Sequence, residues 1–114
     1  MKPKVYTEST IPSYLTGWAS RDLLRATHQQ LTREWWATRE EFDLYVSLLI
    51  LDECAKGDPE AAAERLAALE GLPILEEIQQ VREVAKELMR SVWLPSEAQS
   101  DAVHIATAAV HRID

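Results

Sequence analysis

Residues 5–15 read Val5-Tyr6-Thr7-Glu8-Ser9-Thr10-Ile11-Pro12-Ser13-Tyr14-Leu15, and the fold predicted for the whole chain depends on this stretch. Its β-branched and aromatic start predicts a strand over 4–7, and the polar break after it leads into a helix that begins near Ile11. A carboxylate at such a break lies at the carboxyl end of the strand. Because open α/β sheets bind their ligands along that edge, Glu8 is the first candidate functional residue.

Length, charge and cysteine content limit the class of protein. The 114 residues fit one domain, 1–114, with a modest core. A formal net charge of −7 argues against nonspecific binding to a phosphate backbone, and it leaves a cation site or a basic protein partner open. The opening residues are not followed by an apolar leader, and no apolar run is long enough to span a membrane. Cys54 is the single cysteine, which excludes an internal disulfide. We expect a cytoplasmic protein with no membrane partner.

Strands and helices are predicted to alternate along the chain. Further strands are expected over 42–46 and 72–75, and helices over 21–36, 48–56, 59–69, 78–92 and 97–113. The residues expected to cap four of these helices are Ser20, Ser47, Asp58 and Ser96. The alternation predicts an α/β fold with a parallel sheet, and it also predicts a strand directly after Ile113. Because the sequence stops at Asp114, the chain looks truncated at its carboxyl end.

The helix predicted over 21–36 carries a repeated apolar pattern. Its members recur at helical spacing and are Leu23, Leu24, Thr27, Leu31 and Trp35. We expect the tryptophans of this region to pack in the core or as a lid rather than to stack on bases, because the chain is acidic; they are Trp18, Trp35 and Trp36. Arg21, Arg25 and Arg33 share one face, which is more typical of a solvated helix than of an RNA contact.

Two acids lie on apolar stripes of their helices. Glu53 follows Leu49 and Ile50 by four and three residues, whereas Asp52 points elsewhere. Asp101 has Ile105 one turn away and His104 beside it. An ionised carboxylate on an apolar stripe is costly unless it is paired. A helix-end acid bonded to Lys56 and a first-turn acid that interacts with the helix dipole explain Glu53 and Asp101 equally well, so both interpretations stay open.

Three converging carboxylates would repel one another, and a divalent cation would relieve that repulsion. Mg²⁺ or Mn²⁺ prefers oxygen ligands, and such an ion activates water and offsets charge at a scissile phosphate. Other site chemistries have less support. The three histidines lack zinc-ligand spacing, and neither a glycine-rich phosphate loop nor a GxSxG motif is present.

Three stretches resemble the PIN domain of virulence-associated protein C-type toxins, and the resemblance covers essentially the whole chain. They are VYTESTIPSYL at 5–15, VSLLILDE at 46–53 and SDAVHIATAA at 100–109, of which the last is the most specific. The resemblance implies a three-layer sandwich with a short parallel sheet flanked by helices. It also implies a Mg²⁺- or Mn²⁺-dependent ribonuclease of a toxin–antitoxin pair, a homodimer neutralised by a cognate antitoxin. Its acids would be Glu8, Glu53 and Asp101, supported by Ser9, Thr10 and His104.

The chain departs from the family pattern at two places. Thr7 precedes the first acid, where many relatives carry an apolar residue, and Ser9-Thr10 follow it in place of Thr-Ser. The family also continues into a last strand that often supplies a fourth ligand and pairs beside the first strand. Without that strand, the first strand is expected to present an open edge, which invites a strand-exchanged oligomer. A PIN-like fragment that is catalytically silent and acts through protein association is therefore the alternative to an active ribonuclease.

Overall fold

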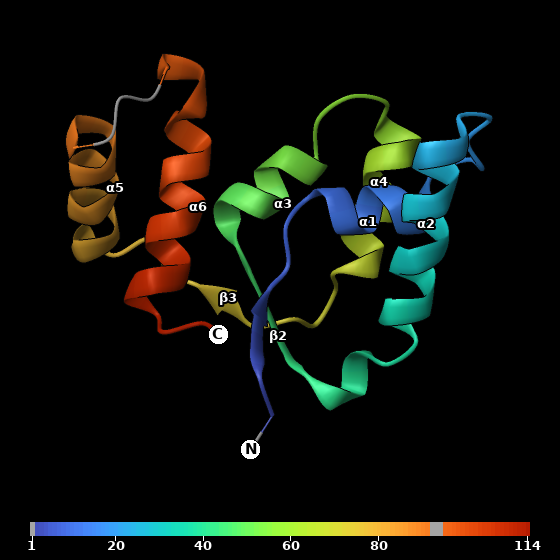
Figure 1. The fold of residues 1–114 in the computed structure, drawn as a ribbon, viewed down its shortest axis with the longest axis horizontal. Coiled ribbons are helices and arrows are strands. Elements are labelled where there is room, and N and C mark those ends of the chain that lie inside the picture. Colours follow the sequence, from blue (N-terminus) through green and yellow to red (C-terminus); the bar gives the residue numbers. More distant parts are fainter. Residues whose placement is uncertain (1, 92–94) are drawn as a thin grey trace. The chain divides into compact units, whose positions relative to one another are not determined.

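The computed structural model describes residues 2–91 and 95–114 and shows a mixed α/β chain (Figure 1). Its contacts divide the chain into two compact units, Met1–Ile74 and Leu75–Asp114. The first unit holds β1 (Lys4–Tyr6), α1 (Thr10–Thr16), α2 (Leu23–Trp36), the 3₁₀ turn η1 (Arg39–Glu41), β2 (Asp43–Ser47), α3 (Leu48–Cys54) and α4 (Pro59–Ala68). The short strand β3 (Ile74–Leu75) spans the boundary, and the second unit continues with α5 (Gln79–Ser91), the 3₁₀ turn η2 (Ser96–Ala98) and α6 (Gln99–Val110).

The strands form a sheet in the order β1-β2-β3. β1 and β2 are parallel, with Val5 opposite Leu44, and the Thr7 amide extends the ladder by donating to the Tyr45 carbonyl at 2.8 Å. The Val46 amide donates to the carbonyl of Pro73 at 3.0 Å on the β3 side. The predicted α/β class with a parallel sheet is confirmed. In the part of the chain that the structure describes, β1 is an edge strand, as expected.

Local sequence signals explain where several helices begin. The Ser47 hydroxyl accepts a hydrogen bond from the Ile50 amide at 3.3 Å, and Asp58 accepts one from the Ala61 amide at 2.9 Å. Pro59 occupies the first turn of α4, where its missing amide hydrogen costs nothing. α3 ends at Cys54 with Ala55 as its C-cap, and Gly57 in the following loop has φ of +86°, a left-handed conformation that favours glycine. The predicted caps Ser47 and Asp58 are therefore confirmed.

Two predicted caps are wrong. Asp22, not Ser20, caps α2 by accepting from the Arg25 amide at 2.9 Å, while the Ser20 hydroxyl accepts from the Asp22 amide. Ser96 begins the turn η2, and α6 starts three residues later without a side-chain cap. In both cases several polar residues compete near the helix start, and an aspartate or an extra turn takes the place of the serine.

The first unit has its core where β2, α3 and the segment after α4 meet. Its fully buried members are Val46, Ile50, Cys54 and Leu69, and the side chains packed against them are Tyr6, Leu51, Leu66 and Leu72. Figure 1 shows α1 and α4 beside each other at the side of α2. Burial of several aliphatic side chains, each worth about 1.5–3 kcal/mol, stabilises this unit.

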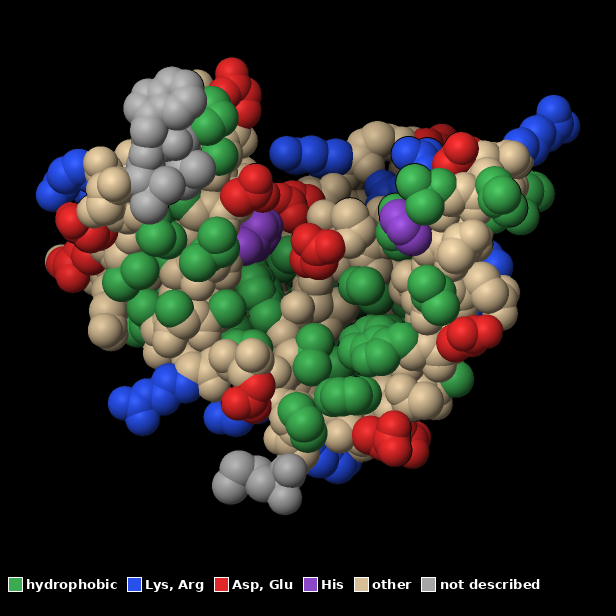
Figure 2. Space-filling view, viewed as in Figure 1, with side chains coloured by type: hydrophobic (Ala, Val, Ile, Leu, Met, Phe, Trp, Pro, Cys, Tyr) green, Lys and Arg blue, Asp and Glu red, His purple; other side chains and the backbone are tan. Residues whose placement is uncertain are grey.

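The helix α2 turns its leucines outward. Leu23, Leu24 and Leu31 are 82%, 66% and 57% exposed, and Trp18 is 97% exposed. Figure 2 shows hydrophobic side chains on the surface over α2. The expectation that Trp18 packs as core or lid is therefore wrong. Trp35 and Trp36 are half-buried; Trp35 contacts Phe42 at 5.8 Å between ring centroids, and Arg39 lies over the Trp36 ring.

Gln29 is the buried residue of α2. Its amide nitrogen donates to the Trp18 carbonyl at 2.9 Å, and its amide oxygen accepts from the Ser20 amide at 3.0 Å. The side chain thus satisfies two backbone groups of the loop before the helix, and it is itself buried. The buried residue of α2 is therefore held by polar contacts, while the leucines of the predicted apolar stripe are exposed.

The second unit is a helical hairpin, in which α5 and α6 run antiparallel (Figure 1). Val81, Ala85 and Ala106 form its buried centre, and Val84, Val103 and Val110 pack against them. His111 and the Glu76 carbonyl are hydrogen-bonded at 2.8 Å, which ties the end of the hairpin to its start. The predicted end of α5 at Val92 lies outside the described residues. None of the helices over 2–91 and 95–114 has the length and apolar character that a membrane span requires.

Candidate functional site

Glu8 lies between β1 and α1, two residues beyond the last strand residue. Its side chain is exposed, and its carboxylate accepts a hydrogen bond from the Thr10 hydroxyl. Of the two predicted supporting hydroxyls, Thr10 contacts Glu8, whereas the Ser9 side chain makes no capping bond. Thr10 therefore limits the rotamers of a carboxylate that is accessible to a ligand.

The carboxyl ends of β1 and β2 are joined by a side-chain contact. The hydroxyl oxygens of Tyr6 and Ser47 are 2.7 Å apart and form a hydrogen bond. Because the two strands are parallel, the segment that carries Glu8 and the helix that carries Glu53 both leave the sheet from this edge. This edge, defined by Glu8, Thr10, Tyr6 and Ser47, is named the strand-end edge below.

The side chain of Thr7 occupies the interior next to the strand-end edge. It is 1% exposed, and its hydroxyl oxygen has no hydrogen-bond partner among the described residues. Successive side chains of a strand alternate between its faces, so Thr7 turns inward while Glu8 reaches solvent. At this position, where the resemblance leads one to expect an apolar residue, the described part of the chain has an unsatisfied polar atom.

Glu53 lies near the end of α3, about 8 Å along the helix from Leu48. It is half-buried, whereas Asp52 is exposed and Cys54 is buried, so the predicted difference between the two acids is confirmed. Arg65 of α4 closes this end of the helix by donating to the carbonyls of Cys54 and Lys56 at 3.1 and 2.6 Å. Nothing in the sequence marked Arg65 as the cation at this helix end, because the contact joins two elements.

The surroundings of Cys54 shift the pKa of its thiol. Burial raises the pKa of the Cys54 thiol; the Arg65 guanidinium opposes this shift, and the Glu53 carboxylate adds to it. Glu53 therefore lies near enough to Cys54 for its negative charge to act on the thiol. The thiol stays neutral near pH 7, which is typical of a structural cysteine rather than a reactive one.

Asp101 lies in the first turn of α6, in the second unit, and its side chain is exposed. Ile105, one turn later, is 57% exposed, so Asp101 does not lie beside a buried apolar side chain at that position. The buried residues of α6 are Ala102, Ala106 and Thr107. His104 follows Asp101 by three residues and is half-buried. The position in the first turn fits an acid that interacts with the helix dipole, which was the open alternative.

The chemistry of these side chains fits a hard cation. Glu8, Glu53 and Asp101 carry carboxylate oxygens, the ligand type that Mg²⁺ and Mn²⁺ prefer, and Glu8 is held by a hydroxyl. Within residues 2–91 and 95–114, however, no group of three His, Cys, Asp or Glu side chains is arranged to hold an ion. The structure thus brings Glu8 and Thr10 together, and the shared metal site stays a prediction.

Sequence reasoning missed a basic row on α5. Arg82, Lys86 and Arg90 follow one another at intervals of four residues and border a hollow against α6. The spacing itself was a readable signal, because three of the four basic residues after position 75 belong to this row, the fourth being Arg112.

Comparisons with protein-family models, with curated proteins and with solved structures found no match to this chain.

Proposed function

We propose that this protein is a Mg²⁺- or Mn²⁺-dependent endoribonuclease of the toxin type with a PIN-like three-layer fold. The observation that supports the proposal best is the strand-end edge. There, an accessible carboxylate follows a parallel strand and accepts a hydrogen bond from Thr10. The resemblance of three sequence stretches to PIN-domain toxins adds the reaction class, the cognate antitoxin and the homodimer to this proposal.

The proposed site assigns a role to each of its residues. Glu8, Glu53 and Asp101 are the metal ligands, Thr10 is a positioning residue for Glu8, and Ser9 and His104 are supporting residues. The bound ion would activate a water molecule and offset negative charge on the scissile phosphodiester. The half-buried position of Glu53 lowers its exposure to water, which strengthens its attraction for a cation.

The hydroxyl of Thr10 contributes before any substrate binds. By donating to Glu8, it holds one carboxylate oxygen and leaves the other available to a ligand. Residues that orient a metal ligand in this way are typically worth 10- to about 100-fold in metal affinity or activity. Tyr6 and Ser47 fix the strand ends behind this carboxylate.

The alternative is a catalytically silent PIN-like protein that acts through protein association. Two observations favour it: β1 is an edge strand in the described part of the chain, and the leucines of α2 face solvent. An edge strand accepts a strand from another chain, either a partner or an exchanged copy. In that case the acids would serve charge and solubility only.

The test is cleavage of an RNA panel with Mn²⁺ by the wild type, Glu8→Gln and Asp101→Asn. We expect each substitution to lower activity by at least about 100-fold, more than the loss of an orienting residue. Thr10→Val should lose 10- to about 100-fold, and Thr10→Ser should restore most of it. Glu40→Gln is the matched control, because Glu40 is an exposed acid that precedes β2 at the opposite end of the strands.

Activity that survives both substitutions would contradict the site assignment. Calorimetry with Mn²⁺ separates the two functions without relying on turnover. Saturable binding that Glu8→Gln abolishes supports the ribonuclease, and absence of binding by the wild type favours the association protein. Sedimentation across a range of protein concentrations would then report any oligomer.

A further inference from the structure

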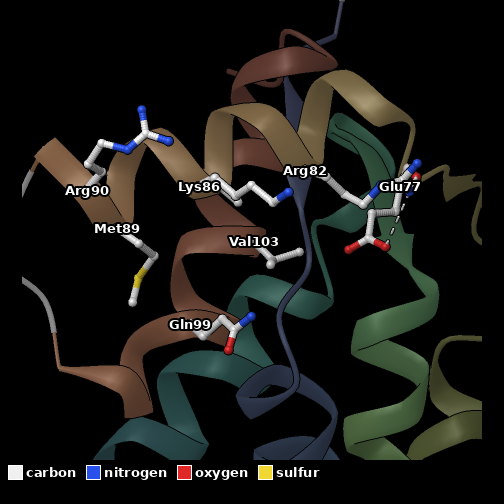
Figure 3. A pocket seen from close by; sticks show the side chains of 8 residues that line it. Glu77, Arg82, Lys86, Met89, Arg90, Gln99 and Val103 are labelled. Carbon is white, nitrogen blue, oxygen red and sulfur yellow. Dashed lines mark hydrogen bonds and ion pairs between the residues drawn. The ribbon is translucent and has the colours of Figure 1, made fainter.

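The hairpin of α5 and α6 contains a hollow that the proposed ribonuclease site does not use. Its volume is about 590 Å³. It is lined by Glu77, Arg82, Ala85, Lys86, Met89, Arg90, Gln99 and Val103, all from the second unit (Figure 3). This volume lies within the range of about 300–1,000 Å³ that is typical of ligand pockets, so the hollow has room for a few side chains of a partner protein.

The floor of the hollow is apolar. Ala85 and Met89 of α5 and Val103 of α6 line it with carbon and sulfur atoms. Ala85 is buried, and Met89 and Val103 are half-buried. Figure 3 shows Met89 and Val103 extending from α5 and α6, with the amide of Gln99 near them. Methionine adapts its shape to different apolar partners, which suits a surface that receives a side chain from another molecule.

The α5 wall of the hollow is basic. Arg82, Lys86 and Arg90 are each one turn apart, so their Cα atoms are spaced by about 6 Å along the helix. Figure 3 shows the Lys86 side chain extending along α5 toward Arg82. The chain as a whole has a formal net charge of −7, so a row of three cations on one wall differs from the acidic character of the rest of the chain.

The three cations are not equivalent. Arg82 has the Glu77 carboxylate at 3.9 Å and donates to the Glu77 carbonyl at 2.8 Å, and Arg90 pairs with Glu87 at 3.2 Å. Lys86, between them, has no side-chain partner within the described ranges. A bound carboxylate would therefore find one unpaired ammonium at the centre of the row and two guanidinium groups that are already partly neutralised.

We propose that this hollow docks an acidic, amphipathic helical peptide segment of a partner protein. An apolar side chain of the segment inserts over Ala85, Met89 and Val103, and a carboxylate beside it pairs with Lys86. A second carboxylate one helical turn away lies level with Arg82 or Arg90, because both helices have the same rise per turn. This inference stands independently of the proposed ribonuclease activity.

Charge complementarity favours such a peptide over RNA. Glu77 and Glu87 neutralise two of the three cations, so the wall offers about one net positive charge, whereas a strand of RNA brings a phosphate every few ångströms. Among the described residues that line the hollow, none is an aromatic side chain on which a base would stack. A single carboxylate next to an aliphatic side chain matches both the net charge and the floor.

The probe is a synthetic helical peptide with leucines along one face and glutamates one turn apart beside them. Its control carries lysines in place of the glutamates and keeps the leucines. Binding to the full chain is measured by calorimetry, and the contact surface is mapped by NMR shifts of the isotope-labelled protein. We expect saturable binding of the acidic peptide, with shifts at Ala85 and Val103, and binding of the lysine peptide that is weaker by at least about tenfold.

Lys86→Glu should weaken binding of the acidic peptide by at least about tenfold, because it places two negative charges against each other. The matched control is Arg112→Glu, which makes the same charge change on a residue of the same unit outside the hollow. Met89→Ser tests the apolar floor separately. Circular dichroism and thermal unfolding of each variant show whether the hairpin is intact.

Several outcomes would overturn the proposal. They are absence of saturable binding to the wild type, equal weakening by Lys86→Glu and Arg112→Glu, and equal affinity for the acidic and the lysine peptide. An RNA oligonucleotide that binds in a Lys86-dependent manner and displaces the peptide would assign the hollow to nucleic acid. Self-association of the chain that Lys86→Glu abolishes would assign it to a second copy.

Discussion

The hydroxyl groups of Tyr6 and Ser47, 41 residues apart in the chain, form a 2.7 Å hydrogen bond where β1 and β2 end. Ser47 has a second role, because its oxygen also accepts the Ile50 amide at the start of α3. One hydroxyl therefore joins two parallel strands and begins the helix that carries Glu53. The strand-end edge depends on this contact for its shape.

Two variants that remove the Tyr6–Ser47 hydrogen bond should lower the free energy of unfolding by different amounts. Tyr6→Phe loses one half-buried hydrogen bond, and we expect a decrease of about 1 kcal/mol in the free energy of unfolding. Ser47→Ala loses the same bond and the helix cap, so its cost should reach about 2 kcal/mol. Urea unfolding monitored by circular dichroism measures both. Tyr45→Phe, which removes a hydroxyl from the neighbouring strand position, is the control and should change little.

Thr7→Val should stabilise the protein. The Thr7 hydroxyl is buried and unpartnered in the described residues, so it incurs a desolvation cost with no bond in return. Replacing it with a methyl group of similar size should raise the free energy of unfolding by about 1 kcal/mol. Thr16→Val is the comparison, because the Thr16 hydroxyl donates to the Pro12 carbonyl at 2.8 Å. A loss of stability in Thr7→Val would mean that this hydroxyl is bonded in solution.

The buried thiol of Cys54 should make the protein less stable at alkaline pH. Because burial raises the pKa of Cys54 in the folded state, the unfolded chain releases this proton first as the pH rises. The contribution is fully present below the unfolded pKa of about 8.5 and is lost as the pH rises through the folded value. We expect the urea midpoint to fall between pH 8 and 10 more steeply in the wild type than in Cys54→Ala. Equal slopes would contradict the inferred shift.

The exposed leucines of α2 should contribute little to the free energy of unfolding. Leu24→Gln and Leu31→Gln replace side chains that are mostly exposed, so each should change the free energy of unfolding by less than about 0.5 kcal/mol. Ile50→Ala, at a fully buried position, should cost about 3 kcal/mol and serves as the contrast. If either glutamine variant costs more than about 1 kcal/mol, the α2 face is covered in solution. Sedimentation of that variant would then show whether a second copy covers it.

Several features of the fold were predictable because they depend on neighbours in the sequence. The caps at Ser47 and Asp58 and the break after β1 each involve contacts within a few residues. The difference between Asp52 and Glu53 also followed from helical spacing. In the site, the hydroxyl held against Glu8 lies two residues away; Ser9 and Thr10 were both predicted as supporting residues, and the contact itself selects Thr10.

Other features were not predictable because they depend on contacts across the chain. The apolar stripe of α2 suggested burial, but its leucines are exposed, and the buried residue is Gln29, whose amide bonds Trp18 and Ser20. The exposure of Asp101 depends on how α6 packs against α5, since Ala102, Ala106 and Thr107 take the buried face.

The sequence by itself determined the order and type of the elements and the position of Glu8 after a strand, since backbone propensity and short-range hydrogen bonds act between near neighbours. Only the tertiary structure decided that Tyr6 meets Ser47, that Arg65 donates to the carbonyls at the end of α3, and that the hydroxyl of Thr7 is buried with no partner among the described residues. The Tyr6–Ser47 contact joins residues 41 positions apart, and such geometry is fixed by strand pairing and close packing rather than by local pattern.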